Sequence, residues 1–245
     1  MIPLKDMTPR RSVPFVTLIL IAINVAVFLH QISLSPSAAE AFIRTYGLVP
    51  AKISLALAGH RYTLAQALIP FFTCMFLHGG WMHIIGNMWF LWIFGANVED
   101  RMGPVPYLIF YLVCGIGSSV AQTSFSWGST LPSIGASGAI SGVLGAYIIY
   151  FPASQILTLI PLFIIWFTAR IPALVFIGLW FVVQFLSGLG SLNNPRAANL
   201  GGVAWWAHVG GFLLGMLLAR LIKPAPRAQG YYGPRGRRAD NSGKS

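Results

Sequence analysis

Two short segments far apart in the sequence contain the side chains of a possible nucleophile and its base. Ser137 lies in the small-residue run GASG at residues 135–138, and His208 lies in the run AHVGG at residues 207–211. A serine hydroxyl becomes a good nucleophile only when a base removes its proton, and histidine has the pKa for that task near neutral pH. The pair therefore predicts acyl transfer, in the form of peptide or ester hydrolysis.

The third member of such a site is normally a carboxylate that orients the imidazole. The chain has 5 acidic residues, which are Asp6, Glu40, Glu99, Asp100 and Asp240. They lie in the terminal segments, in the long loop after the first apolar run, or at the far end of the second apolar run. We therefore expect a Ser–His dyad without an acidic partner.

Acyl transfer also needs hydrogen-bond donors for the oxyanion of the tetrahedral intermediate. His83 and Asn87 are four residues apart, so on a helix they project from the same face. Together with the backbone N–H of Ser137, they are the expected oxyanion donors. Small residues should keep side chains away from this oxygen and let two helices pack closely; these are Gly135, Gly138, Gly211 and Gly215.

The composition places these residues in a membrane. Of the 245 residues, 56% are hydrophobic and only 9% are charged, whereas a water-soluble domain averages about 25% charged residues. A spanning helix needs about 20 mostly apolar residues, and the sequence contains five such runs and a sixth that is rich in Gly and Ala. We therefore expect an all-α bundle of six transmembrane helices. The runs are Val13–Ile32, His83–Val98, Val105–Phe125, Ile134–Tyr150, Ile171–Leu189 and Val203–Ile222.

The basic residues indicate how the chain is oriented. The net charge of +11 comes mainly from residues that flank the first and last apolar runs, which favours a lipid bilayer over a nucleic acid as the partner. The stretch Ile156–Phe167 contains Pro161 and is too short to cross. With six crossings, twelve of the 16 Lys and Arg residues lie on the side of the two termini, so we expect both termini in the cytoplasm.

Three regions follow from this organisation. Residues 1–12 are an N-terminal segment, residues 13–222 are the membrane domain, and residues 223–245 are a basic tail without apolar periodicity, which predicts disorder. The first apolar run is longer than the core of a signal peptide, so we expect it to stay as a span. The lack of a transit-like leader favours a bacterial inner membrane.

In this topology the polar side chains collect in one leaflet. The second, fourth and sixth spans run inward, and the histidines, Asn87 and Ser137 lie near their starts. The third and fifth spans run outward and carry polar residues in their outer halves, namely Ser118, Ser119, Gln122 and Gln184. Because polar groups in a bilayer are costly, this coincidence predicts a water-filled cavity that opens to the outer face.

Taken together, the motifs resemble those of the rhomboid intramembrane serine proteases. The similar segments are residues 76–95 (FLHGGWMHIIGNMWFLWIFG), the GASG run, and the AHVGG run followed by a glycine. The resemblance covers roughly residues 13–222. It implies that Ser137 is the nucleophile, His208 the base, His83 and Asn87 the oxyanion residues, and that His78 lies near the cavity. It also implies cleavage of single-span membrane proteins in or beside their helix, without cofactor or metal, and substrate access past the fifth span.

The sequence departs from the family pattern at two places. Many rhomboids have a Trp-Arg pair where this chain has Ile69-Pro70, and an aromatic ring that supports the catalytic histidine where this chain has Ser141. Two alternative functions are also considered, a client-binding protein without catalytic activity and a small-solute transporter. A catalytically silent, client-binding relative usually lacks the serine or the histidine, and both are present here. A small-solute transporter would be expected to show an inverted repeat or a charged site.

Overall fold

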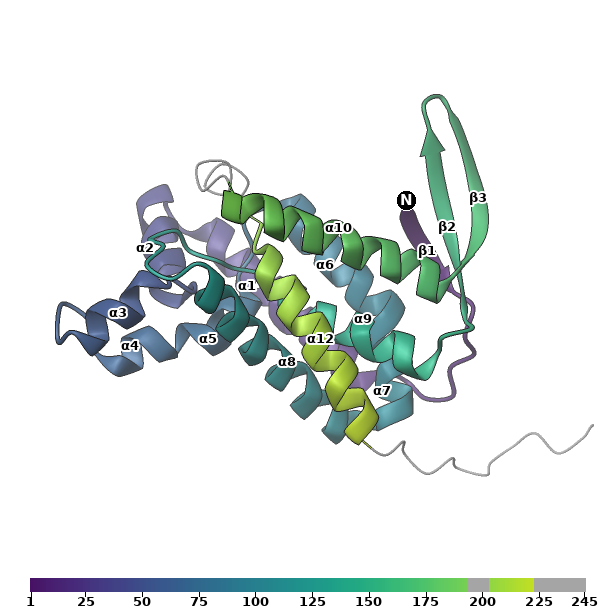
Figure 1. Cartoon of the computed structure of the whole chain (residues 1–245), viewed down its shortest axis with the longest axis horizontal. Coiled ribbons are helices and arrows are strands. Elements are labelled where there is room, and N and C mark those ends of the chain that lie inside the picture. Colours follow the sequence, from purple (N-terminus) through teal and green to yellow (C-terminus); the bar gives the residue numbers. More distant parts are fainter. Residues whose placement is uncertain (194–202, 223–245) are drawn as a thin grey trace, which may run out of the picture.

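Helices form most of the protein, and a small sheet lies at one end of them (Figure 1). The computed structural model describes residues 1–193 and 203–222. Three helices are long and apolar enough to span a membrane: α1 (Phe15–Ser33), α8 (Pro104–Phe125) and α10 (Ala173–Asn193). The bent pair Leu64–Phe76 and Trp81–Met102 is a fourth candidate. The prediction of an integral membrane protein with a mostly helical fold is therefore confirmed.

Two shorter apolar helices complete this set, α9 (Ser137–Tyr150) and α12 (Trp205–Leu221). The bent pair contains α4 (Leu64–Leu68), α5 (Pro70–Thr73), the short turn η1 (Cys74–Phe76), α6 (Trp81–Phe90), a π-helical turn η2 (Leu91–Gly95) and α7 (Ala96–Met102). The expected count of six spans stays a prediction, because α9 and α12 are shorter than a full crossing.

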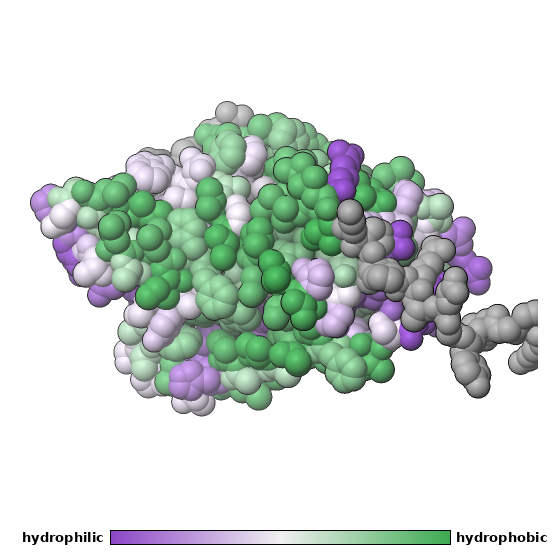
Figure 2. Space-filling model, turned by 90° about the horizontal axis from the view of Figure 1, so that it is seen from below, coloured by the Kyte–Doolittle hydropathy of each residue, from purple (hydrophilic) through white to green (hydrophobic). Residues whose placement is uncertain are grey.

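The surface of these helices is suited to lipid. Figure 2 shows a broad hydrophobic area across the middle of one face, with hydrophilic residues mainly towards its ends. Large apolar side chains are exposed on the candidate spans, among them Ile19 on α1 (56%), Ile109 on α8 (58%) and Leu186 on α10 (59%). In water such an area would cause aggregation, but in a bilayer it contacts acyl chains.

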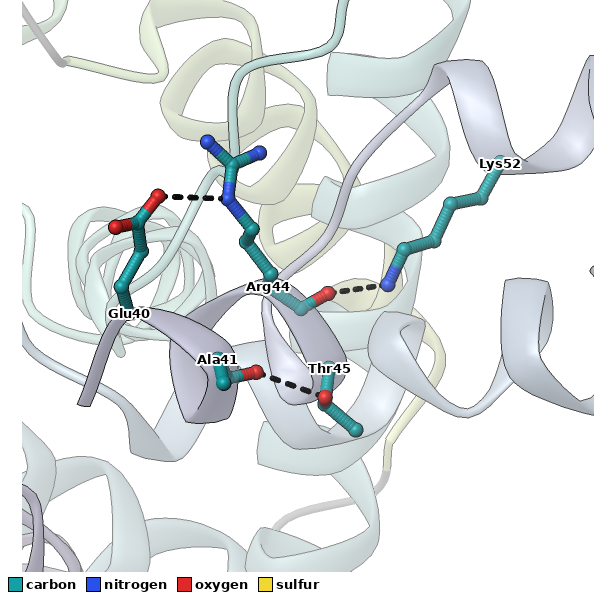
Figure 3. Close-up of polar contacts among 5 residues, drawn as sticks. All are labelled: Glu40, Ala41, Arg44, Thr45 and Lys52. Carbon is teal, nitrogen blue, oxygen red and sulfur yellow. Dashed lines mark hydrogen bonds and ion pairs between the residues drawn. The ribbon is translucent and has the colours of Figure 1, made fainter. Parts of the chain in front are cut away.

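The loop after α1 folds into α2 (Pro36–Tyr46) and α3 (Ala51–Leu57), which a buried lysine joins (Figure 3). The Lys52 ammonium group donates to the Arg44 carbonyl in the last turn of α2, where helix carbonyls lack partners. Burial and the neighbouring Arg44 guanidinium lower the pKa of Lys52. Arg44 itself pairs with Glu40 one turn earlier, at 2.9 Å.

A three-stranded antiparallel sheet contradicts the all-α prediction. Its order is β1 (Ile2–Asp6), β2 (Gln155–Leu162) and β3 (Ile165–Pro172). The non-crossing stretch Ile156–Phe167 forms most of a β-hairpin, since β-branched residues favour strands and Pro161 disfavours a helix. Its turn contains Phe163 at a φ of 51°. The N-terminal segment supplies the third strand.

A buried carboxylate connects this sheet to the helices. Asp6, at the end of β1, accepts hydrogen bonds from the backbone N–H of Thr8 at 2.8 Å and from the Ser154 hydroxyl at 3.1 Å. It also accepts from the side-chain amide of Asn97 in α7. The Tyr147 hydroxyl of α9 donates to Ser154 at 3.0 Å. These bonds attach β1 to the start of α7 and to the last turn of α9.

A second buried carboxylate caps α1. The first N–H groups of a helix lack intrahelical partners, and Pro14 before α1 provides no side-chain cap. Glu99 of α7, which is 3% exposed, accepts from the backbone N–H groups of Val16 and Thr17 at 2.9 and 2.8 Å. A carboxylate at this position also interacts favourably with the positive end of the helix dipole.

We expect Glu99→Ala to lower the free energy of unfolding by about 1–3 kcal/mol, because the change leaves buried donors unpaired. Thermal unfolding in detergent micelles measures this. The neighbouring Asp100 bonds the exposed Ser12 backbone N–H at 2.9 Å, so Asp100→Ala is the matched control and should cost much less. Equal melting temperatures for Glu99→Ala and the unaltered protein would contradict the capping role.

Candidate active site

Ser137 and His208 meet where α9 and α12 begin. The Ser137 Oγ lies 2.7 Å from the His208 Nε2. Ser137 is the first residue of α9, and His208 lies in the first turn of α12. The structure thus brings together two residues that are 71 positions apart in the chain.

Glycines make this approach possible. A Cβ atom at Gly211 would lie 2.1 Å from the Gly138 carbonyl oxygen, and one at Gly215 would lie 2.1 Å from the Gly142 carbonyl oxygen. These distances are far below van der Waals contact, so the backbones of α9 and α12 touch at both positions. Because His208 precedes Gly211 by three residues, this packing holds the imidazole beside Ser137.

A third side chain contacts the other nitrogen of the imidazole. The Gln184 Oε1 on α10 lies 2.7 Å from the His208 Nδ1, and Gln184 is 7% exposed. An amide oxygen only accepts hydrogen bonds, so this contact requires the proton on Nδ1. In this tautomer the Nε2 lone pair faces the serine hydroxyl, as a general base requires. The sequence predicts that Gln184 lies in the outer half of its span but does not predict this contact.

His83 and Asn87 lie one turn apart on α6 and direct free donors towards the start of α9. The backbone N–H of Gly79 donates to the His83 Nδ1 at 3.3 Å, so the neutral ring carries its hydrogen on Nε2. The Asn87 Nδ2 is buried and has no hydrogen-bond partner among the described residues. A Cβ at Gly135 would lie 2.6 Å from the His83 Nε2 and 3.5 Å from the Asn87 Nδ2.

Gly135 is therefore required for two reasons. Its φ of +125° is rarely adopted by residues with a side chain, and a Cβ would also collide with the His83 ring. The space that this glycine leaves free is next to both donors. An oxyanion that formed at Ser137 would lie close to this space.

A cavity of about 430 Å³ connects these groups. It lies between α6 and α10, and its wall contains the four predicted residues Ser137, His208, His83 and Asn87. The remaining wall is mostly apolar and includes Phe90, Leu144 and Trp180. The cavity is large enough for several residues of an extended peptide segment and offers them polar groups only near Ser137.

His78 lies behind the site and not in the cavity wall. It is 2% exposed, and its ring packs edge-on against His83 with 5.1 Å between the ring centroids. The backbone N–H of His78 donates to the Gln31 side chain of α1 at 3.0 Å. The His78 ring thus contacts a residue of the cavity wall without lining the cavity itself.

The polar residues of α8 do not line the cavity, since its wall contains none of Ser118, Ser119 and Gln122. The hydroxyls of Ser118 and Ser119 donate to the Gly115 carbonyl of their own helix, at 2.7 and 3.1 Å. Buried serines commonly make this bond. Gln122 has a different role, since its Oε1 accepts from the backbone N–H of Ala207 at 3.1 Å. It thereby fixes the first turn of α12.

Comparison with known proteins decides which family this arrangement belongs to. Residues 65–225, more than half of the chain, match the Rhomboid domain. This chain belongs to the rhomboid family. RHOMBOID-like protein 1 of Arabidopsis thaliana is 31% identical to it over 164 residues, which are 67% of this chain and 36% of that protein. Rhomboid protein 1, mitochondrial, of Saccharomyces cerevisiae is 31% identical over 162 residues, which are 63% of this chain and 42% of that protein. The chain thus spans less than half the length of these two relatives.

The two departures from the rhomboid pattern have structural counterparts. Ser141 donates from its hydroxyl to the Ser137 carbonyl at 2.6 Å and offers the histidine no ring. Aromatic rings near His208 come from other positions, namely Trp180 and Trp205, with ring centroids 5.9 and 6.3 Å away. Ile69 is 53% exposed at the start of α5 and does not line the cavity.

Proposed function

We propose that this rhomboid is an intramembrane serine endopeptidase that cleaves single-span membrane proteins in or near their transmembrane helix. The observation that carries the proposal is the 2.7 Å contact between the Ser137 hydroxyl and the His208 imidazole, inside a cavity that also holds His83 and Asn87. Family membership adds support, because rhomboids are generally intramembrane serine proteases.

The proposed reaction follows from the positions of these groups. His208 Nε2 takes the Ser137 proton as Oγ attacks the peptide carbonyl carbon. The resulting oxyanion accepts hydrogen bonds from Asn87, from His83 and from the backbone N–H of Ser137. That N–H belongs to the first turn of α9, where it has no intrahelical acceptor. The protonated His208 then gives its proton to the leaving amine, and a water molecule hydrolyses the acyl-enzyme by the same route.

The proposed topology has six crossings with both termini in the cytoplasm. Two crossings between the start of α9 and the start of α12 put Ser137 and His208 at the same depth. The excess of basic residues on the side of the termini supports the same orientation. We propose a bacterial inner membrane as the location. The yeast relative, which is 31% identical to this chain, is by its name a mitochondrial protein.

The test is cleavage of a reporter by the purified chain in proteoliposomes. The reporter is a single-span protein with a different tag at each end, and mass spectrometry identifies the new termini. Two fragments that meet in or beside the transmembrane segment are the expected result. Stable binding of the reporters without any fragment, across a varied panel, would favour the client-binding alternative and contradict the proposal.

Asn87→Ala should lower kcat by about 10²–10³ with little change in KM, because an oxyanion donor acts mainly in the transition state. Steady-state kinetics on the reporter measure both constants. Asn24 on α1 is a matched control, since it is also buried but its amide bonds the Leu20 carbonyl of its own helix, at 2.8 Å. Unchanged turnover in Asn87→Ala would remove this residue from the oxyanion site.

Gln184→Leu should lower kcat by roughly 10–100-fold, the effect that is typical when a metal-binding histidine loses the hydrogen-bond partner that orients it. Gln184→Glu keeps an acceptor oxygen and should recover most of the rate. The comparison uses kcat, KM and the melting temperature in detergent. If both variants lose the same activity, or Gln184→Leu loses none, the positioning role is wrong.

A further inference from the structure

The β2–β3 hairpin has an apolar tip that no described part of the protein covers. Figure 1 shows the hairpin projecting away from the helices beyond the end of β1. At its turn, Phe163 and Ile164 are 94% and 95% exposed, and the flanking Ile165 and Trp166 are each 64% exposed. These four residues, with Leu162 and Phe167, form the tip. In a membrane protein, such a surface needs a partner that is not water.

The base of the hairpin has a different chemistry. The register places Lys5 of β1 opposite Leu157, and Leu157 opposite Arg170 of β3. Directly paired residues point to the same side of a sheet, so both cations lie on one face. Lys5 and Arg170 are exposed, and among the described residues neither forms an ion pair. The other face is buried, with Ile156 and Thr158 at 0% exposure.

The hairpin is continuous with a lipid-facing helix. β3 ends at Pro172, and α10 begins at Ala173 without a linker. The Ala173 N–H donates to the Ser154 carbonyl at 2.8 Å, which fixes the base of the hairpin to the start of α10. Leu174 and Val175, the next residues of α10, are 54% and 55% exposed. The apolar surface of a candidate span therefore begins where the hairpin ends.

We propose that this hairpin is a lipid-binding element that lies in the membrane interface beside α10, with its tip among the upper acyl carbons and with Lys5 and Arg170 on anionic headgroups. Aromatic and basic residues are enriched at this depth. The outer edge of β3 has no partner strand in the described sheet. Unpaired backbone groups are not tolerated in the hydrocarbon core, so the hairpin must remain near the interface.

Depth-dependent fluorescence quenching tests this proposal without any substrate, so its result is independent of the proposed protease activity. An environment-sensitive NBD dye is attached at Ile164→Cys, and at Val183→Cys in the middle of α10 as the reference for the bilayer centre. The native Cys74 and Cys114 are buried, and the unaltered chain gives the labelling blank. The vesicles contain phosphatidylcholine and phosphatidylglycerol at 3:1, with a doxyl quencher at acyl carbon 5 or 12.

The dye at residue 164 should be quenched more by the carbon-5 quencher, and the dye at residue 183 more by the carbon-12 quencher. Quenching of residue 164 by aqueous iodide with no effect of either lipid quencher would overturn the proposal, as would stronger quenching from carbon 12. A Lys5→Glu/Arg170→Glu variant should weaken carbon-5 quenching at residue 164 and leave residue 183 unchanged. No change at residue 164 would exclude the two cations from the contact.

Discussion

Ser137→Ala should abolish cleavage of a transmembrane reporter, with a loss in kcat on the order of 10³–10⁶. The Ser137 hydroxyl is the proposed group that forms the covalent bond with the substrate, and an alanine side chain has no nucleophilic atom. Ser119→Ala is the control, because Ser119 is also a buried serine but lies outside the cavity wall, and its hydroxyl bonds the Phe71 and Gly115 carbonyls, each at 3.1 Å. Turnover by each purified variant in the same proteoliposomes is the measurement.

His208→Ala should be as inactive as Ser137→Ala, and the double variant no worse than either. Residues that act as one catalytic unit have non-additive effects, since removing either one disables the other. The 2.7 Å contact between their side chains predicts this behaviour. Residual activity in Ser137→Ala, or a double variant that is far slower than both single variants, would mean that the two groups act separately.

Gly215→Val should destabilise the protein and disable the site, although residue 215 lies outside the cavity. A Cβ there would lie 2.1 Å from the Gly142 carbonyl oxygen and 2.5 Å from the Gly142 Cα. Both obstacles are backbone atoms, so α9 and α12 must move apart. Overpacking of this kind costs about 1–3 kcal/mol, and a valine side chain places the effect at the upper end.

Gly178→Ala on α10 is the control for Gly215→Val, because a Cβ at Gly178 meets nothing within 4 Å. This control should keep or slightly raise the melting temperature, since alanine favours a helix more than glycine does. Thermal unfolding in detergent gives the stability, and reporter cleavage gives the activity. A Gly215→Val protein with unchanged melting temperature and turnover would contradict the close packing of the two helices.

The proximity of Ser137 and His208 can be predicted from the sequence, because each residue lies in a short run of small residues. The runs around Ser137 and His208 predict where helices start and which faces pack closely. The role of Gln184 as a partner of His208 is not predicted, because the residue that orients such a histidine is normally a carboxylate. Its signal was a single amide in an otherwise apolar helix, and such a residue usually has a buried partner.

The sheet was missed for a different reason. The length of Ile156–Phe167 and its Pro161 exclude a membrane crossing but do not by themselves predict a strand. The alternation of β-branched residues at Ile156, Thr158 and Ile160 favours a strand, but strand pairing depends on β1, which lies about 150 positions away. Long-range pairing of this kind is set by tertiary structure, and local patterns do not reveal it.

Mass spectrometry of the chain after reaction with a fluorophosphonate tests the central claim most directly, because such a reagent labels a serine only when a base activates it. The account predicts one adduct, on Ser137, which is lost in His208→Ala and retained in Ser119→Ala. An adduct on another residue, or cleavage of the reporter by a chain that remains unlabelled at Ser137, would contradict it.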